Sequence, residues 1–390
     1  MTDVEARLSV RGRFAVGGLY AGGFLGPFGG GVVSPVLPEI GADFHTTAGS
    51  AALSLTAYMI PFAGLMLVSG TLGQRWGAAR STRVAYVVYL VVSLVCVLPG
   101  PFWQFLLARA AQGAANAFTT PLLLASVAEI TPANRLGRAL GLFGSLQAAG
   151  QTSAPLVAGL VAAASWRYAF IGSAVVAGVL AVIGLPPAVH QQAGQQRSNS
   201  TLRSAFRPAV LRIGLAGFLG WGCLGGLAFL VSFRAQDAFG LSAGSRGALL
   251  TVFGIAGMLT ARLVGHLVDR WGGRWSVTLG MTVGAALLVG VGSLPSTVVV
   301  GVLWALCGVA SQLVLVGVNS LALSSTENRG GAVSVVQACR FLGAALAPVA
   351  FTSVYHAGPL IAFLLPAGLL VAGLPSVLVG RRRRLERHAE

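Results

Sequence analysis

The sequence predicts an all-α membrane protein in which twelve transmembrane helices form two pseudo-symmetric bundles of six. Three observations predict this fold: the composition, a series of apolar runs of spanning length, and a repeat at half the chain length. Hydrophobic residues make up 55% of the 390 residues and charged residues only 9%, whereas a soluble domain carries about 25% charged residues. Such a chain cannot cover its surface with polar groups, which excludes the soluble class.

The apolar runs fall into two groups of six, because a membrane-spanning helix needs about 20 mostly apolar residues. In the first half the spans lie within Phe14–Pro38, Thr46–Gln74, Val84–Pro99, Pro101–Ala128, Ala139–Trp166 and Tyr168–Val189. In the second half they lie within Ile213–Phe233, around Gly247–Ala261, in Trp275–Thr326 (two spans divided at Pro295), in Gly330–Tyr355 and in Gly358–Gly380. The predicted organisation is therefore a bundle over 1–189, a polar linker over 190–212 and a bundle with a basic tail over 213–390.

A repeat with an offset of 195 residues relates the two halves. Gly70, Arg75, Trp76 and Gly77 recur as Gly265, Arg270, Trp271 and Gly272. Further matches keep the offset within two residues: Ala21-Gly22 with Ala216-Gly217, Thr56 with Thr251, Asn134-Arg135 with Asn328-Arg329, and Pro155 with Pro348. Parallel six-span repeats are a transporter architecture, with the substrate site expected near the midplane between the repeats.

The charge pattern predicts the orientation. The net charge is +16 and all 26 basic residues are arginine. Most arginines lie on one side of a twelve-span path, which the positive-inside rule assigns to the cytoplasm together with both termini and the linker. Since the arginines separate apolar runs instead of lining one amphipathic face, we expect a lipid bilayer and a small-molecule substrate as partners, no nucleic acid, and a monomer in the inner (plasma) membrane.

Enzymatic and metal chemistry find no support in the sequence. The four cysteines, Cys96, Cys223, Cys307 and Cys339, all lie in apolar runs and have no metal-ligand spacing. No phosphate-binding loop and no nucleophile–base set is visible. We therefore expect a protein that is not an enzyme, with no metal and no cofactor.

Four motifs carry a resemblance to the major facilitator superfamily over nearly the whole chain. The loop pattern G-x-L-x-D-R-x-G-x-R is met by Gly265, Leu267, Asp269, Arg270, Gly272 and Arg274, and in part by Gly70, Leu72, Arg75, Gly77 and Arg80. Span 4 begins its motif at Arg109, followed by Gln112-Gly113. Span 5 carries Gly150, Ala154, Pro155 and Gly159, a variant of an antiporter pattern. Span 6 opens with Trp166-Arg167-Tyr168-Ala169-Phe170.

The first half is most similar to the twelve-span drug-efflux branch of that family. The resemblance implies that the loop residues act as a gate and that the span 5 residues pack helices closely. The chain departs from the branch in three ways: Gln74 replaces the loop acid of the first half, Ala154 and Ala158 replace glycines, and no Asp or Glu lies inside any span.

Polar residues within spans are the candidates for the substrate cavity, because an ionisable group at membrane depth is costly and usually faces the bundle interior. The predicted set is Arg109, Gln112, Asn116, Gln147, Gln151, Trp221, Trp304, Gln312, Asn319, Gln337 and Arg340. For Arg109 the alternative is a structural hydrogen bond to helix carbonyls. For Arg340 it is a contact between helices or a position outside the assigned span, and for the amides it is a contact between helices. For the two tryptophans it is packing or contact with lipid. Glu39 and Asp43, with Arg109, are the candidates for proton coupling.

The predicted function is secondary active transport by alternating access, as efflux of drug-like or metabolite solutes coupled to protons. The alternative is a carrier of a small organic or inorganic anion that uses Arg109 and Arg340. A non-transporting membrane receptor is a minor alternative.

Overall fold

The computed structural model describes residues 10–132, 135–186, 207–325 and 329–378, and these residues form helices and connecting turns without a strand. The long helices in chain order are α2 (Val10–Gly31), α5 (Leu53–Arg75), α6 (Ala78–Val95), α7 (Phe102–Ile130), α8 (Leu136–Val161), α9 (Arg167–Ile183), α11 (Pro208–Gly222), α13 (Ala243–Trp271), α14 (Gly273–Ser293), α15 (Thr297–Ser325), α16 (Arg329–Ala357) and α17 (Pro359–Gly373). The predicted all-α fold of twelve long helices is confirmed.

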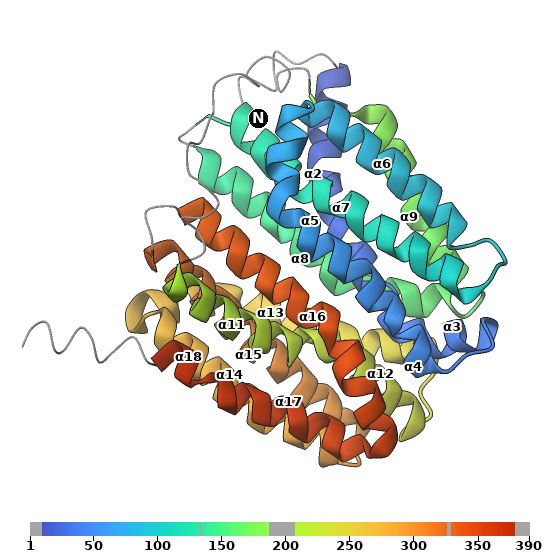
Figure 1. Cartoon of the computed structure of the whole chain (residues 1–390), viewed down its shortest axis with the longest axis vertical. Helices are drawn as coiled ribbons and strands as arrows, with labels where there is room; N and C mark the ends of the chain where they lie inside the picture. Colours follow the sequence, from blue (N-terminus) through green and yellow to red (C-terminus); the bar gives the residue numbers. More distant parts are fainter. Residues whose placement is uncertain (1–9, 133–134, 187–206, 326–328, 379–390) are drawn as a thin grey trace, which may run out of the picture.

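Short helices cap one end of the molecule. They are η1 (Ser34–Val36), α3 (Leu37–Asp43), α4 (Ala48–Ala51), η4 (Gly225–Leu227) and α12 (Ala228–Asp237), while α18 (Pro375–Leu378) follows α17. Figure 1 shows α3, α4 and α12 together on the right-hand side. We call this the α3 end, and we call the opposite end, which carries the turns at Gly77 and Gly272, the turn end.

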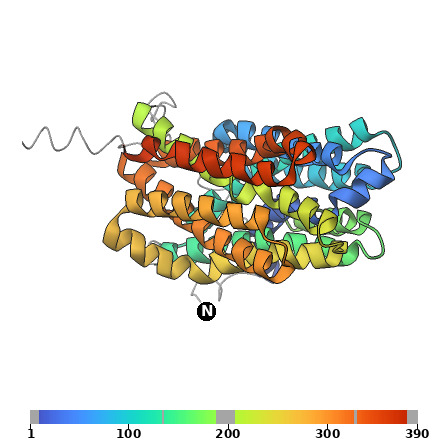
Figure 2. The same ribbon diagram turned by 90° about the horizontal axis from the view of Figure 1, so that it is seen from below.

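The helices divide into two bundles. α2 to α9 pack among themselves, and α11 to α17 do likewise; α8 with α13 and α5 with α16 make the main contacts between the groups. In Figure 1 the first group, blue to green, lies above the second, yellow-green to red. Figure 2, seen from below, shows the helices of the second group running side by side. Since the repeat relates α5 to α13 and α8 to α16, the two inter-bundle contacts are images of each other.

Two glycines at equivalent places of the repeat close equivalent turns. Gly77 has a φ of 90° and precedes α6, and Gly272 has a φ of 86° and precedes α14. L-residues with a side chain rarely adopt such a positive φ, so only glycine fits both turns without strain. The sharing of this backbone conformation 195 residues apart confirms that the repeat is structural.

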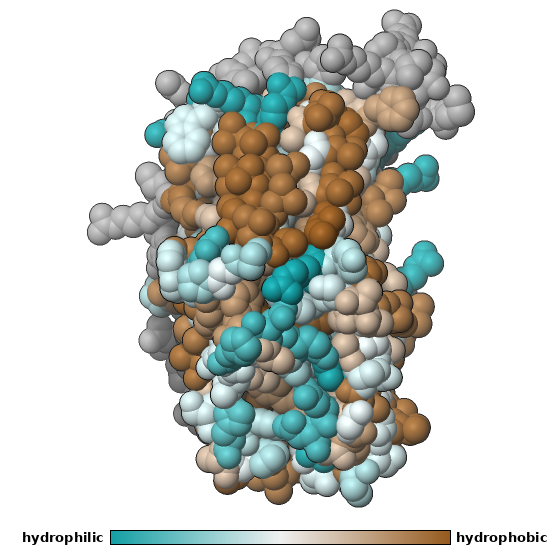
Figure 3. Space-filling model, turned by 90° about the vertical axis from the view of Figure 1, so that its right-hand side faces the viewer, coloured by the Kyte–Doolittle hydropathy of each residue, from teal (hydrophilic) through white to brown (hydrophobic). Residues whose placement is uncertain are grey.

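Many large hydrophobic side chains are exposed, as they are in a protein surrounded by lipid. Within the described residues, eight helices are long and apolar enough to cross a membrane by length and composition, and α9 is a shorter apolar helix. In Figure 3, which shows the right-hand side of Figure 1, hydrophobic side chains gather in the upper part and hydrophilic ones across the centre and lower part. The chain is a multi-pass membrane protein.

Several observed helix boundaries differ from the predicted runs. α11 begins at Pro208, within the stretch assigned to the linker, because proline at the first helical position fixes a helical φ and lacks only an N–H that would be unpaired. α13 continues past Ala261 to Trp271, since Arg262 is exposed on its surface and does not end the helix. Residues 190–206 of the predicted linker, Asn134 and Asn328 of the repeat, and the basic tail 379–390 lie outside the described residues.

Candidate functional site at the interface between the bundles

The bundles touch closely at the α3 end. A Cβ atom built on Gly159 of α8 would lie 2.4 Å from the carbonyl oxygen of Ala243 in α13, and one on Gly247 would lie 2.3 Å from that of Pro155. Real Cβ atoms do not approach backbone this closely, so the crossing of α8 and α13 requires both glycines. The predicted packing role of Gly159 thus lies at the contact between bundles.

The other residues of the span 5 motif lie deeper in α8. A Cβ on Gly150 would lie 2.2 Å from the carbonyl oxygen of Phe24, so Gly150 allows α8 to approach α2 within the first bundle. Ala154 and Ala158 are fully buried, and the ideal Cβ of Gly31 lies 3.1 Å from that of Ala154. The methyl groups that replace the family's glycines are therefore accommodated.

The same helices separate toward the turn end. Cβ atoms built on Gly141 and Gly144 of α8 and on Gly265 of α13 would meet no atom within 4 Å. Leu142, with 52% of its surface exposed, and Leu263, with 61%, lie along these separated stretches. The described part of the interface is therefore closed at the α3 end and open at the turn end.

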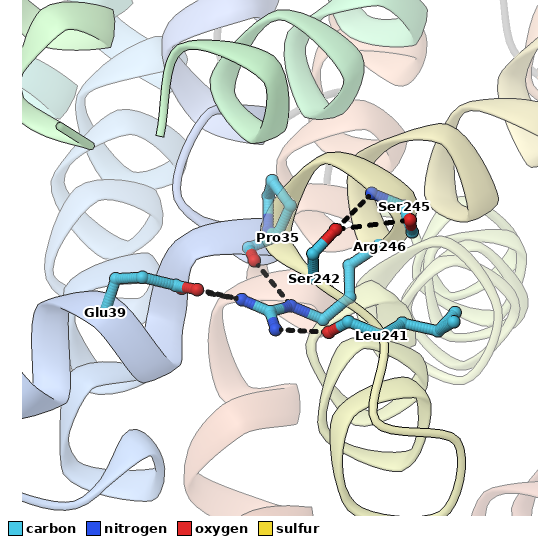
Figure 4. Close-up of polar contacts among 6 residues, drawn as sticks. All are labelled: Pro35, Glu39, Leu241, Ser242, Ser245 and Arg246. Atoms are coloured by element: carbon cyan, nitrogen blue, oxygen red, sulfur yellow. Dashed lines mark hydrogen bonds and ion pairs between the residues drawn. The ribbon is translucent and has the colours of Figure 1, made fainter. Parts of the chain in front are cut away.

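An ion pair joins the bundles at the α3 end (Figure 4). The Arg246 guanidinium of α13 donates from one nitrogen to both carboxylate oxygens of Glu39 in α3, at 2.5 and 2.6 Å. It also donates to the carbonyl oxygens of Pro35 (2.9 Å) and Leu241 (2.8 Å). The Arg246 side chain is 3% exposed and that of Glu39 is 33% exposed, so the carboxylate alone remains accessible to solvent. We call this contact the Glu39–Arg246 latch.

Asp43 serves a different contact. Its carboxylate accepts from Arg167 and, at 2.6 Å, from the indole Nε1 of Trp166, both in the first half. The structure therefore brings neither Glu39 nor Asp43 to Arg109, and the three predicted coupling residues do not form one cluster.

Arg109 lies inside the first bundle and is fully buried. One of its terminal nitrogens donates to the side-chain oxygen of Gln112 at 2.7 Å and the other to the carbonyl oxygen of Gly29 at 3.2 Å. The guanidinium carbon lies 4.4 Å from the centroid of the Tyr58 ring. This placement fits the structural alternative for Arg109, because its terminal nitrogens are used within the bundle.

Gln112 and Asn116 belong to the same buried network. Gln112 donates to the hydroxyl of Ser93 at 2.7 Å, and Asn116 donates to the Tyr58 hydroxyl at 2.8 Å and to the Gly26 carbonyl at 3.2 Å. Both residues are at most 2% exposed. They connect α7 with α2, α5 and α6, and they do not reach the open part of the interface.

The remaining amides are divided between exposed and buried positions. Gln147 is half-buried and Gln151 is exposed on α8, the helix that separates from α13 toward the turn end. Gln312 of α15 is half-buried and lies near Gly257 of α13. The side-chain oxygens of Asn319 and Gln337 are buried and accept no hydrogen bond from a described residue.

The two candidate tryptophans have different surroundings. Trp304 of α15 is 1% exposed and packs on Phe253 with ring centroids 4.7 Å apart, so it is core within the second bundle. Trp221 of α11 is half-buried and lies over Arg340 of α16, with the guanidinium carbon 4.5 Å from its ring centroid. The ring centroid of Phe341 is 4.4 Å from the same carbon.

The predicted gate residues lie at the turn end and are spread apart. Arg75, Arg80, Asp269, Arg270 and Arg274 are all exposed. None of them belongs to the two ion pairs found among the described residues, which both lie at the α3 end. Gly70 and Gly265 are half-buried on the helices that precede the two turns. The charged residues of the two predicted gate motifs are therefore not paired with each other in this conformation.

Thr56, Phe62 and Arg246 complete the interface, and the sequence reasoning missed the last two as site residues. The Thr56 hydroxyl of α5 donates to the carbonyl oxygen of Ala345 in α16 at 2.6 Å, and Phe62 meets Phe341 edge-on at 4.9 Å. The repeat had singled out Thr56, but no local pattern distinguishes Arg246 or Phe62.

Among the described residues, no group of three or more His, Cys, Asp and Glu side chains could hold a metal ion.

Comparison with known proteins places this geometry in a family. The sequence profile of the Major Facilitator Superfamily matches residues 19–348 and 236–388. The chain is similar to the uncharacterized transporter YebQ of Escherichia coli (strain K12), with 25% identity over 378 residues that cover 80% of this chain and 82% of YebQ. It is also similar to the drug efflux pump JefA of Mycobacterium tuberculosis (strain ATCC 25618 / H37Rv), with 32% identity over 142 residues, covering 36% of this chain and only 28% of JefA.

Solved structures share the fold at low identity. A bacterial homolog of the human lysosomal transporter Spinster, in an inward-facing and occupied conformation, matches with a TM-score of 0.76 and 15% identity over 95% of this chain and 97% of that chain. The nucleoside transporter NupG matches with a TM-score of 0.76 and 13% identity over 94% and 99%. With a family profile that spans most of its length and this fold, the chain belongs to the Major Facilitator Superfamily and is a secondary transporter of small molecules, not an enzyme.

Proposed function

We propose that this transporter exports drug-like or metabolite solutes across the plasma membrane in exchange for protons. The observation that carries the proposal is the interface itself, closed at the α3 end by the Glu39–Arg246 latch and open at the turn end. The positive-inside rule assigns the turn end to the cytoplasm. In this conformation a solute would enter from the cytoplasm, and release would require the α3 end to open. The similarity to the drug efflux pump JefA supports the same direction.

The latch supplies a route for proton coupling. Protonation of Glu39 from the outer side would remove the negative charge that Arg246 needs, leaving a nearly buried cation with two carbonyl acceptors. Removing one partner of a buried ion pair is strongly unfavourable because the other charge remains without compensation. The α3 end would then open and hydrate Arg246, which links proton binding to solute release.

Everted vesicles test this proposal. Nile red, a neutral lipophilic solute, is followed by fluorescence while an acidic vesicle interior is imposed on wild type, Glu39→Gln and Asp237→Asn. Asp237 is the matched control because its carboxylate also lies at the α3 end but accepts from Tyr355 within the second half. Nile red transport by wild type and by Asp237→Asn should accelerate with the gradient, whereas transport by Glu39→Gln should respond little. If transport by wild type does not change with the gradient, the proposed coupling to protons is wrong.

A carrier of a small organic or inorganic anion is the second candidate. It is favoured by Arg340, a nearly buried cation for which the described residues supply no counter-charge. Arg109 supports this candidate less, because its terminal nitrogens already donate within the first bundle.

A further inference from the structure

Four arginines are buried among the described residues, and one of them differs from the others. Arg109 donates to Gln112 and Gly29, Arg234 donates to the carbonyls of Gly292 and Leu294, and Arg246 donates to Glu39, Pro35 and Leu241. Arg340 differs in that it makes no hydrogen bond or ion pair with a described residue; its Nε is buried without an acceptor, as are those of Arg109 and Arg234. Only 9% of the residue is exposed, and its terminal nitrogens are not among the fully buried atoms, so they can donate to a partner that the described residues do not supply.

Aromatic rings hold this guanidinium in place. The Trp221 and Phe341 rings have their centroids 4.5 and 4.4 Å from its central carbon. Ring faces attract a cation, but they do not replace acceptors for the N–H groups in the guanidinium plane. We call Arg340, Trp221 and Phe341 the Arg340 cage. The five N–H donors of the Arg340 guanidinium keep the planar geometry that matches a carboxylate.

The cage lies next to a contact between the two bundles. Phe341 contacts Phe62 of α5, the described aromatic contact that joins the bundles. α16 runs from the turn end to the α3 end, so Arg340 is one residue nearer the turn end than Phe341. It is 11 residues from the helix start at Arg329, or roughly 16 Å at 1.5 Å per residue, near the middle of a bilayer core. Transporters of this architecture bind substrate at this depth between the repeats.

We infer that the Arg340 cage binds an amphipathic organic anion, a carboxylate attached to a flat apolar ring. This inference rests on the transporter function proposed above and names the substrate class of its anion alternative. The carboxylate would accept from the N–H fork of Arg340 and supply the absent counter-charge. The apolar ring would pack against the half-buried Trp221 and the exposed interface next to it. A bare inorganic anion would match the charge and leave the aromatic surface unused.

A matched ligand series tests the inference on the purified full chain in nanodiscs. The probes are 2-naphthoate, the neutral 2-naphthalenemethanol, the cationic 2-naphthylmethylammonium, and acetate as a carboxylate without a ring. Binding is measured by the shift in melting temperature and by titration of tryptophan fluorescence, because a ligand of the folded state raises its stability. The variants are Arg340→Ala, Arg340→Lys and Trp221→Phe, with Arg262→Ala as an exposed-arginine control.

We expect 2-naphthoate to bind wild type and Arg262→Ala at least tenfold more tightly than the other three probes. Arg340→Ala should lose that preference, Arg340→Lys should keep part of it, and Trp221→Phe should weaken it. Ligand-free Arg340→Ala should melt no lower than wild type, since it removes an uncompensated buried charge; a residue that only joins helices would lower it. Equal binding of the alcohol, or naphthoate binding retained in Arg340→Ala, overturns the inference. Nile red transport by the same purified chain reconstituted in sealed vesicles reports separately whether the carrier function holds.

Discussion

Gly113 of α7 and Gly308 of α15 make the same contact in the two halves of the molecule. A Cβ on Gly113 would lie 1.9 Å from the carbonyl oxygen of Tyr58, and one on Gly308 would lie 2.0 Å from that of Phe253. The two glycines are 195 positions apart, and so are Tyr58 and Phe253. The repeat therefore preserves the approach of two helix backbones, α5 to α7 and α13 to α15, although the side chains around the contacts have diverged.

Alanine at either glycine should destabilise the fold. The added methyl group would overlap backbone that cannot move aside like a flexible side chain, so Gly113→Ala and Gly308→Ala should each lower the free energy of unfolding by about 1–3 kcal/mol or more. Melting temperature in detergent checks this. Gly172→Ala in α9 is the control, since its Cβ would meet nothing within 4 Å and alanine favours the helix. Equal melting temperatures for all three variants would contradict the packing argument.

The number of helices, the repeat and the two turns could be predicted because they depend on neighbouring residues. A run of apolar residues has the length of the bilayer core, and a Gly in a charged loop meets the demand for positive φ at Gly77 and Gly272. The family resemblance adds the order of the helices. These features need no knowledge of which distant residues come together.

The site could be predicted only in part, because its chemistry depends on contacts between distant residues. Arg109 and Arg340 are both arginines within apolar spans, and nothing local separates them. The structure distinguishes them by their hydrogen-bond partners. Arg109 donates to the carbonyl of Gly29, 80 residues away, whereas Arg340 has no described acceptor. The Glu39–Arg246 latch likewise joins residues 207 positions apart.

Exchanging the two charges of the Glu39–Arg246 latch should restore closure of the α3 end, which either single reversal weakens. Glu39→Arg places two cations together at the α3 end, and Arg246→Glu does the same with two carboxylates, so both should weaken closure of that end. The double variant restores an ion pair of opposite polarity. Spin labels at the exposed Ala42 and Ala238 report the opening of the α3 end by distance measurement. Single variants should show a longer distance that the double variant shortens.

The exchange need not be complete, because Arg246 also donates to the carbonyls of Pro35 and Leu241 and a glutamate cannot. A double variant that is no better than the worse single variant would show that these carbonyl bonds, and not the charge pair, close the end. Asp237→Asn serves again as the control and should leave the distance unchanged.

Arg109 should contribute to stability and not to solute affinity. Arg109→Ala leaves the Gln112 side-chain oxygen and the Gly29 carbonyl without a donor in the buried interior. We expect the free energy of unfolding to fall by about 2–5 kcal/mol, as for loss of a buried charged hydrogen-bonding group. Gln151→Ala on α8 is exposed and should change it by less than about 0.5 kcal/mol. A variant of Arg109 that melts like wild type but binds solute more weakly would return it to the substrate site.

Asp269→Asn should favour the conformation that is open at the turn end. In this conformation Asp269 is exposed and belongs to neither described ion pair, so the substitution removes no contact. When the turn end closes, the family resemblance implies that this acid pairs with a neighbouring arginine. A surface ion pair is worth up to about 1 kcal/mol, which corresponds to roughly a fivefold change in the population of the closed state. Spin labels at the exposed Leu142 and Leu263 should show the short-distance fraction falling by that factor, while the melting temperature stays unchanged. An unchanged distance distribution would mean that the acid has no part in closing the gate.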